Sequence, residues 1–131
     1  MARNGEGVGR VRARLLVAKG SFSAMGGAER DIIRNLTALS KKFEVSVATL
    51  DSAQQLDSIC DECGIKLMKP DNYWKPPQDP VSRILDKEFN SSLESWKSVG
   101  GLVESLENFD YVHLTSGDGS LSMLEIIPDG I

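Results

Sequence analysis

The sequence predicts an α/β fold built on a parallel sheet, and three observations lead to it. Apolar runs typical of strands alternate with segments of helical periodicity, in the order β-α-β-α-β-α-β-α. The first strand is apolar at consecutive positions, Leu15-Leu16-Val17-Ala18, as expected for a strand covered on both faces. A chain of 131 residues, 40% of them hydrophobic, suits one globular domain. Together these features indicate a Rossmann-like, doubly wound sheet in three layers, α/β/α.

The chain opens with a predicted leader and a first β-α unit. Residues 1–12 show no apolar periodicity, so we expect a disordered leader before a single domain over residues 13–131. The first strand is expected over 12–18, with a loop rich in glycine and serine over 19–27. Apolar residues at helical spacing then predict a helix over 27–42, which ends in two lysines that complement the helix dipole.

A second β-α unit and a third strand follow directly. The alternation of valine with polar residues predicts a strand over 44–50. Ser52 can cap a second helix, and Gly64 suits its C-terminal end. The short apolar run over 65–68 is then expected to be the third strand.

The rest of the chain predicts a long connection and a fourth strand. Four prolines exclude a helix or a central strand over 70–80. An amphipathic stretch runs over 81–106, with a kink expected at Gly100-Gly101. A fourth strand over 110–115 and a helix over 120–127 follow. We expect the parallel order 3-2-1-4, in a domain truncated before a fifth strand.

Composition narrows the function classes. The longest apolar run near the start has four residues, too few for a spanning helix or an export signal. We therefore expect a cytoplasmic protein, with a peripheral contact at the cytosolic membrane face left open. The net charge is −4 although residues 1–14 carry four arginines against one glutamate, so the body is acidic. An acidic body argues against nucleic acid as a partner.

The two cysteines do not indicate a redox or metal site. Cys60 and Cys63 fall near the predicted end of a helix, whereas a reactive pair belongs at a helix N-terminus, where the dipole lowers the pKa of a thiol. Two cysteines and one distant histidine cannot complete a tetrahedral zinc site. We expect the pair to lie along the buried stripe of the helix, and we expect no metal.

Ligands of such sheets bind beyond the carboxyl ends of the strands, here between the first and the fourth strand. The loops over 19–27 and 115–120 fall at that place. Gly26 and Gly27 lead into a helix, whose free N–H groups and dipole attract anions. Alternatively, the two glycines serve only a tight turn. We expect Gly27 to be needed both for the approach of a phosphate and for its backbone angle.

Standard nucleotide fingerprints are absent from the sequence. No G-x-G-x-x-G lies in the loop over 19–27, and no P-loop lysine follows Gly26-Gly27. Asp51 ends the second strand, where a dinucleotide-binding fold places its ribose-binding acid, but an aspartate at such a position more often serves a turn or a cap. The neighbouring aromatics Tyr73 and Trp74 could stack on a sugar, lean on a membrane or pack back on the long helix.

Several motifs lie in a consistent order over residues 12–128: Leu15-Leu16-Val17, Gly26-Gly27-Ala28-Glu29-Arg30, Phe43-Glu44-Val45-Ser46-Val47, Asp110-Tyr111-Val112-His113-Leu114-Thr115 and Ser120-Leu121-Ser122-Met123-Leu124. This arrangement resembles the N-terminal domain of GT-B glycosyltransferases, specifically the large retaining family four. Phe43 and Thr115 each stand where that family has a histidine.

The resemblance implies transfer of a sugar from a nucleotide-sugar to a sugar or lipid acceptor, with retention of configuration and no further cofactor. It implies that Gly26 and Gly27 lie near the donor diphosphate, and that His113, Thr115 and Ser116 line the substrate cleft. Threonine cannot act as a base near neutral pH, so position 115 would not handle protons as the family's histidine could.

The resemblance also implies a C-terminal domain that carries most donor contacts and a Glu-x7-Glu motif. No two glutamates of this sequence have that spacing. We therefore expect the incomplete half of a GT-B fold, inactive alone, whose second domain is supplied in cis or in trans. The alternative is a non-catalytic Rossmann-like binding module, or the partner subunit of a split enzyme.

Overall fold

A computed structural model describes residues 12–23, 26–76, 87–115 and 119–128, so residues 1–11 of the predicted leader lie outside the described residues. Four strands form one sheet: β1 (Arg14–Ser21), β2 (Glu44–Asp51), β3 (Lys66–Met68) and β4 (Tyr111–Leu114). All pairs are parallel and the order is β3-β2-β1-β4, which confirms the predicted topology. The six inner residues of β1 are buried, as its apolar run predicts.

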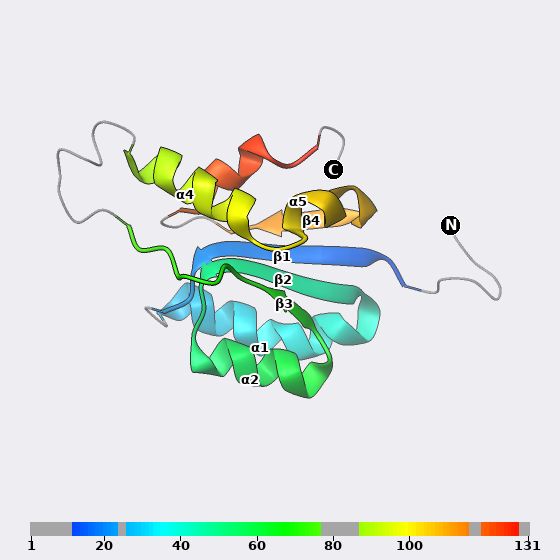
Figure 1. Cartoon of the computed structure of the whole chain (residues 1–131). Coiled ribbons are helices and arrows are strands. Elements are labelled where there is room, and N and C mark those ends of the chain that lie inside the picture. The colour runs from blue at the N-terminus through cyan, green and yellow to red at the C-terminus, as the bar shows by residue number, and fades with distance from the viewer. Residues whose placement is uncertain (1–11, 24–25, 77–86, 116–118, 129–131) are drawn as a thin grey trace.

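Helices cover both faces of the sheet (Figure 1). One face carries α1 (Gly27–Lys42) and α2 (Gln54–Cys63). The other carries α4 (Lys87–Ser98), α5 (Leu102–Ser105) and two 3-10 helices, η1 (Leu106–Asn108) and η2 (Leu121–Glu125). The chain is thus an α/β protein of three layers, with helices wound on both sides of a parallel sheet.

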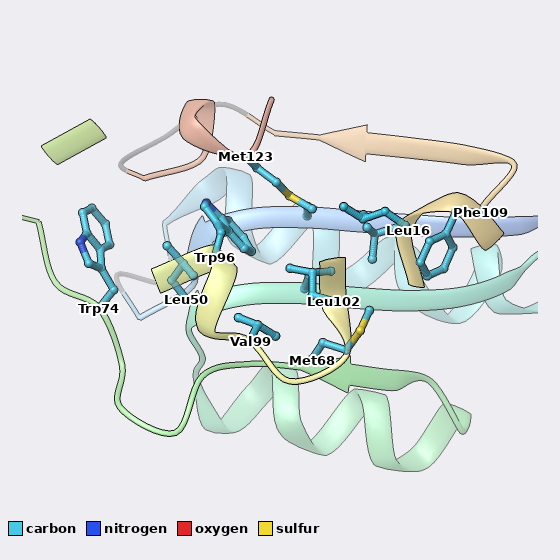
Figure 2. Close-up of a cluster of buried hydrophobic side chains, with 12 residues drawn as sticks. Leu16, Leu50, Met68, Trp74, Trp96, Val99, Leu102, Phe109 and Met123 are labelled. Atoms are coloured by element: carbon cyan, nitrogen blue, oxygen red, sulfur yellow. The ribbon is translucent and has the colours of Figure 1, made fainter. Parts of the chain in front are cut away.

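Each face of the sheet has its own hydrophobic core. Under α1 and α2, Val17 and Val47 of the sheet pack with Leu36 and Leu56 of the helices. The opposite core surrounds the fully buried Trp96 of α4, and Figure 2 shows Leu50, Leu102 and Met123 beside it. Because a core lies on each face of the sheet, the inner strands are covered on both sides. This explains why β1 is apolar at consecutive positions.

Three local expectations need correction. Ser52 is not the helix cap: Ala53 holds that position, and the Ser52 hydroxyl donates instead to Oδ1 of Asp57 at 2.7 Å. Residues 81–86 of the expected amphipathic stretch lie outside the described residues. The rest is broken rather than kinked, since Gly101 adopts a left-handed conformation (φ 78°) between α4 and α5. The last helix is a 3-10 helix of five residues. Gly64, in contrast, ends α2 in the left-handed conformation, as predicted.

The segment after β3 crosses the C-terminal edge of the sheet and holds Trp74 against α4. The Trp74 amide donates to the carbonyl of Leu50 at 3.0 Å, and its indole N–H donates to the Ser91 hydroxyl at 2.9 Å. Trp74 is buried whereas Tyr73 is 41% exposed, so of the two aromatics only Tyr73 is available at the surface. No helix in the described part of the chain is both long enough and apolar enough to span a membrane.

Candidate functional site

Gly26 and Gly27 lie at the start of α1, directly after β1. Gly26 is the N-cap, and its amide donates to Oε1 of Glu29 at 2.8 Å. The amides of Gly27 and Ala28 make no hydrogen bond to other described residues, as the geometry of a helix start leads one to expect. These N–H groups, with the positive end of the helix dipole behind them, form an anion-attracting surface.

The backbone does not require glycine at position 27. The described glycines with positive φ are Gly64, Gly101 and Gly119, so the expectation that a side chain at Gly27 forces a disallowed angle is wrong. A Cβ at Gly27 would meet nothing within 4 Å among the described atoms. Helix starts tolerate most residues, so the fold itself leaves position 27 open to a side chain. What glycine provides there is unobstructed access to the amides.

A buried ion pair anchors this helix start to the sheet. Lys19 of β1 and Glu29 of α1 are only 6% and 8% exposed, and Nζ of Lys19 lies 3.5 Å from Oε2 of Glu29. The other oxygen of Glu29 accepts the Gly26 amide. The glutamate of the Gly-Gly-Ala-Glu motif therefore points inward and holds the Gly26 amide, while the amides of Gly27 and Ala28 are left without a partner among the described residues. Glu29 belongs to a motif that carries the resemblance, but this ion pair was not predicted, because Lys19 was assigned to the loop over 19–27 whereas β1 extends to Ser21.

Asp51 joins three segments at the same edge of the sheet. Its carboxylate accepts from Nζ of Lys75 at 2.7 Å and from the Ser21 hydroxyl at 3.1 Å, and its carbonyl accepts the Phe22 amide. Burial raises the pKa of Asp51, but hydrogen bonds from Lys75, Ser23 and Ser21 and the charge of Lys75 outweigh it, so the pKa lies below its ordinary value. Through these contacts the Asp51 carboxylate connects the ends of β1 and β2. With its oxygen bonded to Ser21 and Lys75, the carboxylate is not available to a ribose in this arrangement.

The end of β4 lies beside the end of β1. The Thr115 amide donates to the carbonyl of Ala18 at 3.0 Å, and the Thr115 hydroxyl is buried with no hydrogen-bond partner among the described residues. The hydroxyl of Ser120 accepts the Gly20 amide at 2.8 Å and so ties the loop after β4 to β1. Ser116 lies outside the described residues.

His113 occupies a different place from the two glycines. It is exposed and lines a groove of about 440 Å³ with Leu15, Ile32 and Leu39, along the middle turns of α1. The first turn of α1, with Gly26 and Gly27, does not line that groove. The structure thus brings Thr115 to the end of β1, whereas His113 faces the α1 side of the sheet.

The two cysteines lie near the C-terminal end of α2. Cys60 and Cys63 are free thiols, Cys60 is buried as predicted, and burial raises its pKa to about 12, which makes it inert as a nucleophile at neutral pH. No group of three or more histidine, cysteine or acidic side chains in the described ranges could hold a metal ion.

No family model, curated protein or solved structure matches the chain. Its function must therefore be argued from the residues that the fold brings together.

Proposed function

We propose that this chain is the acceptor-side, N-terminal half of a retaining glycosyltransferase of GT-B type, which uses a nucleotide-sugar donor and is incomplete without a second domain. One observation carries the proposal: Gly26-Gly27-Ala28-Glu29 forms the start of α1 after the carboxyl end of β1, the strand that pairs with β4. In doubly wound sheets this junction is where ligands bind.

The chemistry of the junction supports a diphosphate as the bound group. The exposed amides of Gly27 and Ala28 can each donate to a phosphate oxygen, and the helix dipole favours negative charge there. Because Glu29 is turned toward Lys19, its charge is neutralised locally instead of repelling an anion. As a diphosphate leaves a sugar it gains negative charge, and fixed N–H donors stabilise this charge.

The proposal is tested by thermal unfolding of the 131-residue chain with nucleotide-sugars. UDP-glucose, GDP-mannose and ADP-glucose are compared with free glucose and with inorganic phosphate at matched ionic strength. A ligand at ten times its dissociation constant stabilises a protein by about 1.4 kcal/mol, which raises Tm by about 5 °C for a chain of this size. Because the second domain would carry most donor contacts, we expect weak binding, so that at least one nucleotide-sugar gives such a shift only at high ligand concentration. No shift with any of them, or the same shift with phosphate alone, would argue for a binding module of another kind.

A further inference from the structure

The segment that follows β3 is held at two points and presents three side chains between them. Pro70 and Trp74 are buried, and the Trp74 amide is hydrogen-bonded to the end of β2. Asp71, Asn72 and Tyr73 are exposed. Because the stretch is held on both sides, these three side chains project from a backbone that is anchored to the sheet. Polar and aromatic side chains on an anchored loop are a common setting for a binding site.

A surface hollow of about 520 Å³, which we call the Tyr73 hollow, is lined by these three side chains with Lys69 and Pro70. Its volume is typical of small-molecule sites, which measure roughly 300–1,000 Å³. Nζ of Lys69 lies 5.7 Å from the centroid of the Tyr73 ring, and Tyr73 remains 41% exposed. The side chains of Asp71 and Asn72 have no hydrogen bond or ion pair within the described part of the chain, so their polar groups are available to a ligand.

The charges around the Tyr73 hollow favour a neutral ligand. Lys69 also lines a second hollow beside α2, with Asp57 and Asp61. Its ammonium lies 3.4 Å from Oδ1 of Asp57, which neutralises it locally. Asp61 and Asp71 add negative charge, which repels phosphate and an anionic lipid surface. A ligand cation gains little in turn, because Lys69 already holds the position over the Tyr73 ring.

We propose that the Tyr73 hollow is a binding subsite for a neutral carbohydrate. Sugar hydroxyls donate and accept hydrogen bonds, which the Asp71 carboxylate, the Asn72 amide and the Lys69 ammonium complement. The C–H groups on one face of a sugar carry slight positive charge and pack on the negative face of an aromatic ring, here that of Tyr73. Within the proposed function this sugar is the acceptor, and in that role the inference rests on the proposed function.

The place of the hollow in the sheet suits an acceptor. The hollow directly follows the carboxyl end of β3, and α1 begins after the carboxyl end of β1. Since all the strands are parallel, these ends lie at the same edge of the sheet. Only β2 separates β1 from β3, which corresponds to about 10 Å between the two strands. A donor at the start of α1 and a sugar in the Tyr73 hollow would thus share one edge.

The test is a titration of the isotope-labelled 131-residue chain with neutral sugars, followed by amide chemical shifts. The probes are the methyl glycosides of glucose, mannose, galactose and N-acetylglucosamine, with inorganic phosphate as the charged comparison. Tyr73→Ala removes the aromatic ring, and Tyr73→Phe keeps it. Tyr111→Ala is the matched control, because Tyr111 is a 58% exposed tyrosine of β4 that does not line the hollow. Thermal unfolding checks that every variant is folded.

We expect at least one sugar to shift the amides of residues 69–75 saturably, with a dissociation constant on the order of 1 mM because the hollow is open. Tyr73→Ala should weaken this binding by about tenfold, whereas Tyr73→Phe and Tyr111→Ala should bind like the wild type. Phosphate should give no saturable shift at these residues. The proposal is overturned if no sugar gives saturable shifts there, if phosphate gives the same shifts, or if Tyr73→Ala binds as well as the wild type.

The titrations separate this inference from the proposed function. Sugar-induced shifts at residues 69–75, in a chain whose α1 start does not respond to any nucleotide-sugar, would support the carbohydrate subsite and count against the glycosyltransferase. Shifts of Gly26 and Gly27 with a nucleotide-sugar, without a response of residues 69–75 to any neutral sugar, would overturn the carbohydrate subsite alone.

Discussion

Gly119, which follows Gly117-Asp118 in the loop after β4, has a structural role. Its φ of +77° lies in the left-handed region, and an added Cβ would lie 2.6 Å from Cζ3 of Trp74. Its carbonyl accepts the indole N–H of Trp96 at 2.8 Å and the Ser122 hydroxyl at 3.2 Å. One residue thus connects both tryptophans to the loop that follows β4.

We expect Gly119→Ala to destabilise the protein by about 2–4 kcal/mol, through backbone strain and the overlap with Trp74. In thermal unfolding this corresponds to a fall in Tm of roughly 10 °C. Gly100→Ala is the control, because Gly100 has no positive φ and no atom within 4 Å of its added Cβ. Equal Tm values for the two variants would show that the strain at Gly119 is not real.

Asp51 makes stability depend on pH. Its pKa is lowered in the folded protein, so its carboxylate stabilises the fold above the pKa of an unfolded aspartate, about 3.9, and this contribution is lost as the pH falls through the folded pKa. Asp51→Asn should cost about 1–3 kcal/mol in urea unfolding at pH 7. The gap between wild type and variant should shrink as the pH falls below about 4.

Asp31→Asn serves as the control for the pH series, because the Asp31 side chain is 69% exposed and its 3.3 Å ion pair is with Arg34, which is also exposed. Its stability should stay within about 0.5 kcal/mol of wild type. A difference between wild type and Asp51→Asn that stays constant from neutral to acidic pH would contradict the role given to the carboxylate.

At the scale of elements, the contact between β1 and α1 depends on the Lys19–Glu29 pair. Lys19→Met leaves Glu29 buried without its cation, which should destabilise the fold by roughly 3–5 kcal/mol. Adding Glu29→Gln should restore much of that loss, since it removes the unpaired charge. Urea unfolding of both single variants and the double variant measures the coupling. Additive effects would mean that the two side chains stabilise the fold independently.

The elements themselves were largely predictable, because periodicity and burial act along the chain. β1 was predicted from its apolar run and α1 from its apolar face. The end of α2 was predicted from its glycine. Ser52 was misassigned because Asp57 competes for its hydroxyl, a contact five residues away that no cap rule contains. The break at Gly101 depends on a left-handed angle, which a Gly-Gly pair permits but does not require.

The candidate site was predictable only in part. The position of Gly26 and Gly27 follows from local sequence, since a loop that leads into a helix places them at its first turn. The inward turn of Glu29 and the pairing of Asp51 with Lys75 depend on segments 10 and 24 residues apart that only the folded sheet brings together. His113 falls on the α1 face because side chains alternate along β4, with Val112 and Leu114 packed against the opposite core.

At the scale of the whole molecule, the proposal gives this chain half of the cleft that the reaction needs. Under the proposal, the start of α1 supplies backbone donors for the diphosphate, and the donors that face it across the cleft belong to the second domain. The isolated chain should therefore release no nucleoside diphosphate from any nucleotide-sugar above the rate without enzyme, whichever sugar acceptor is added. Steady release by the isolated chain would show that the half is already sufficient.

The central claim, that the start of α1 receives the diphosphate of a nucleotide-sugar, is tested most directly by amide chemical-shift mapping. Labelled wild-type chain and Gly27→Val are titrated with the nucleotide-sugar that stabilises the wild type most. We predict that the amides of Gly26, Gly27 and Ala28 shift most in the wild type. In Gly27→Val, whose added side chain meets no described atom within 4 Å of Cβ, the rest of the spectrum should persist while these ligand-induced shifts disappear. Shifts centred elsewhere, or equal binding by Gly27→Val, would contradict the account.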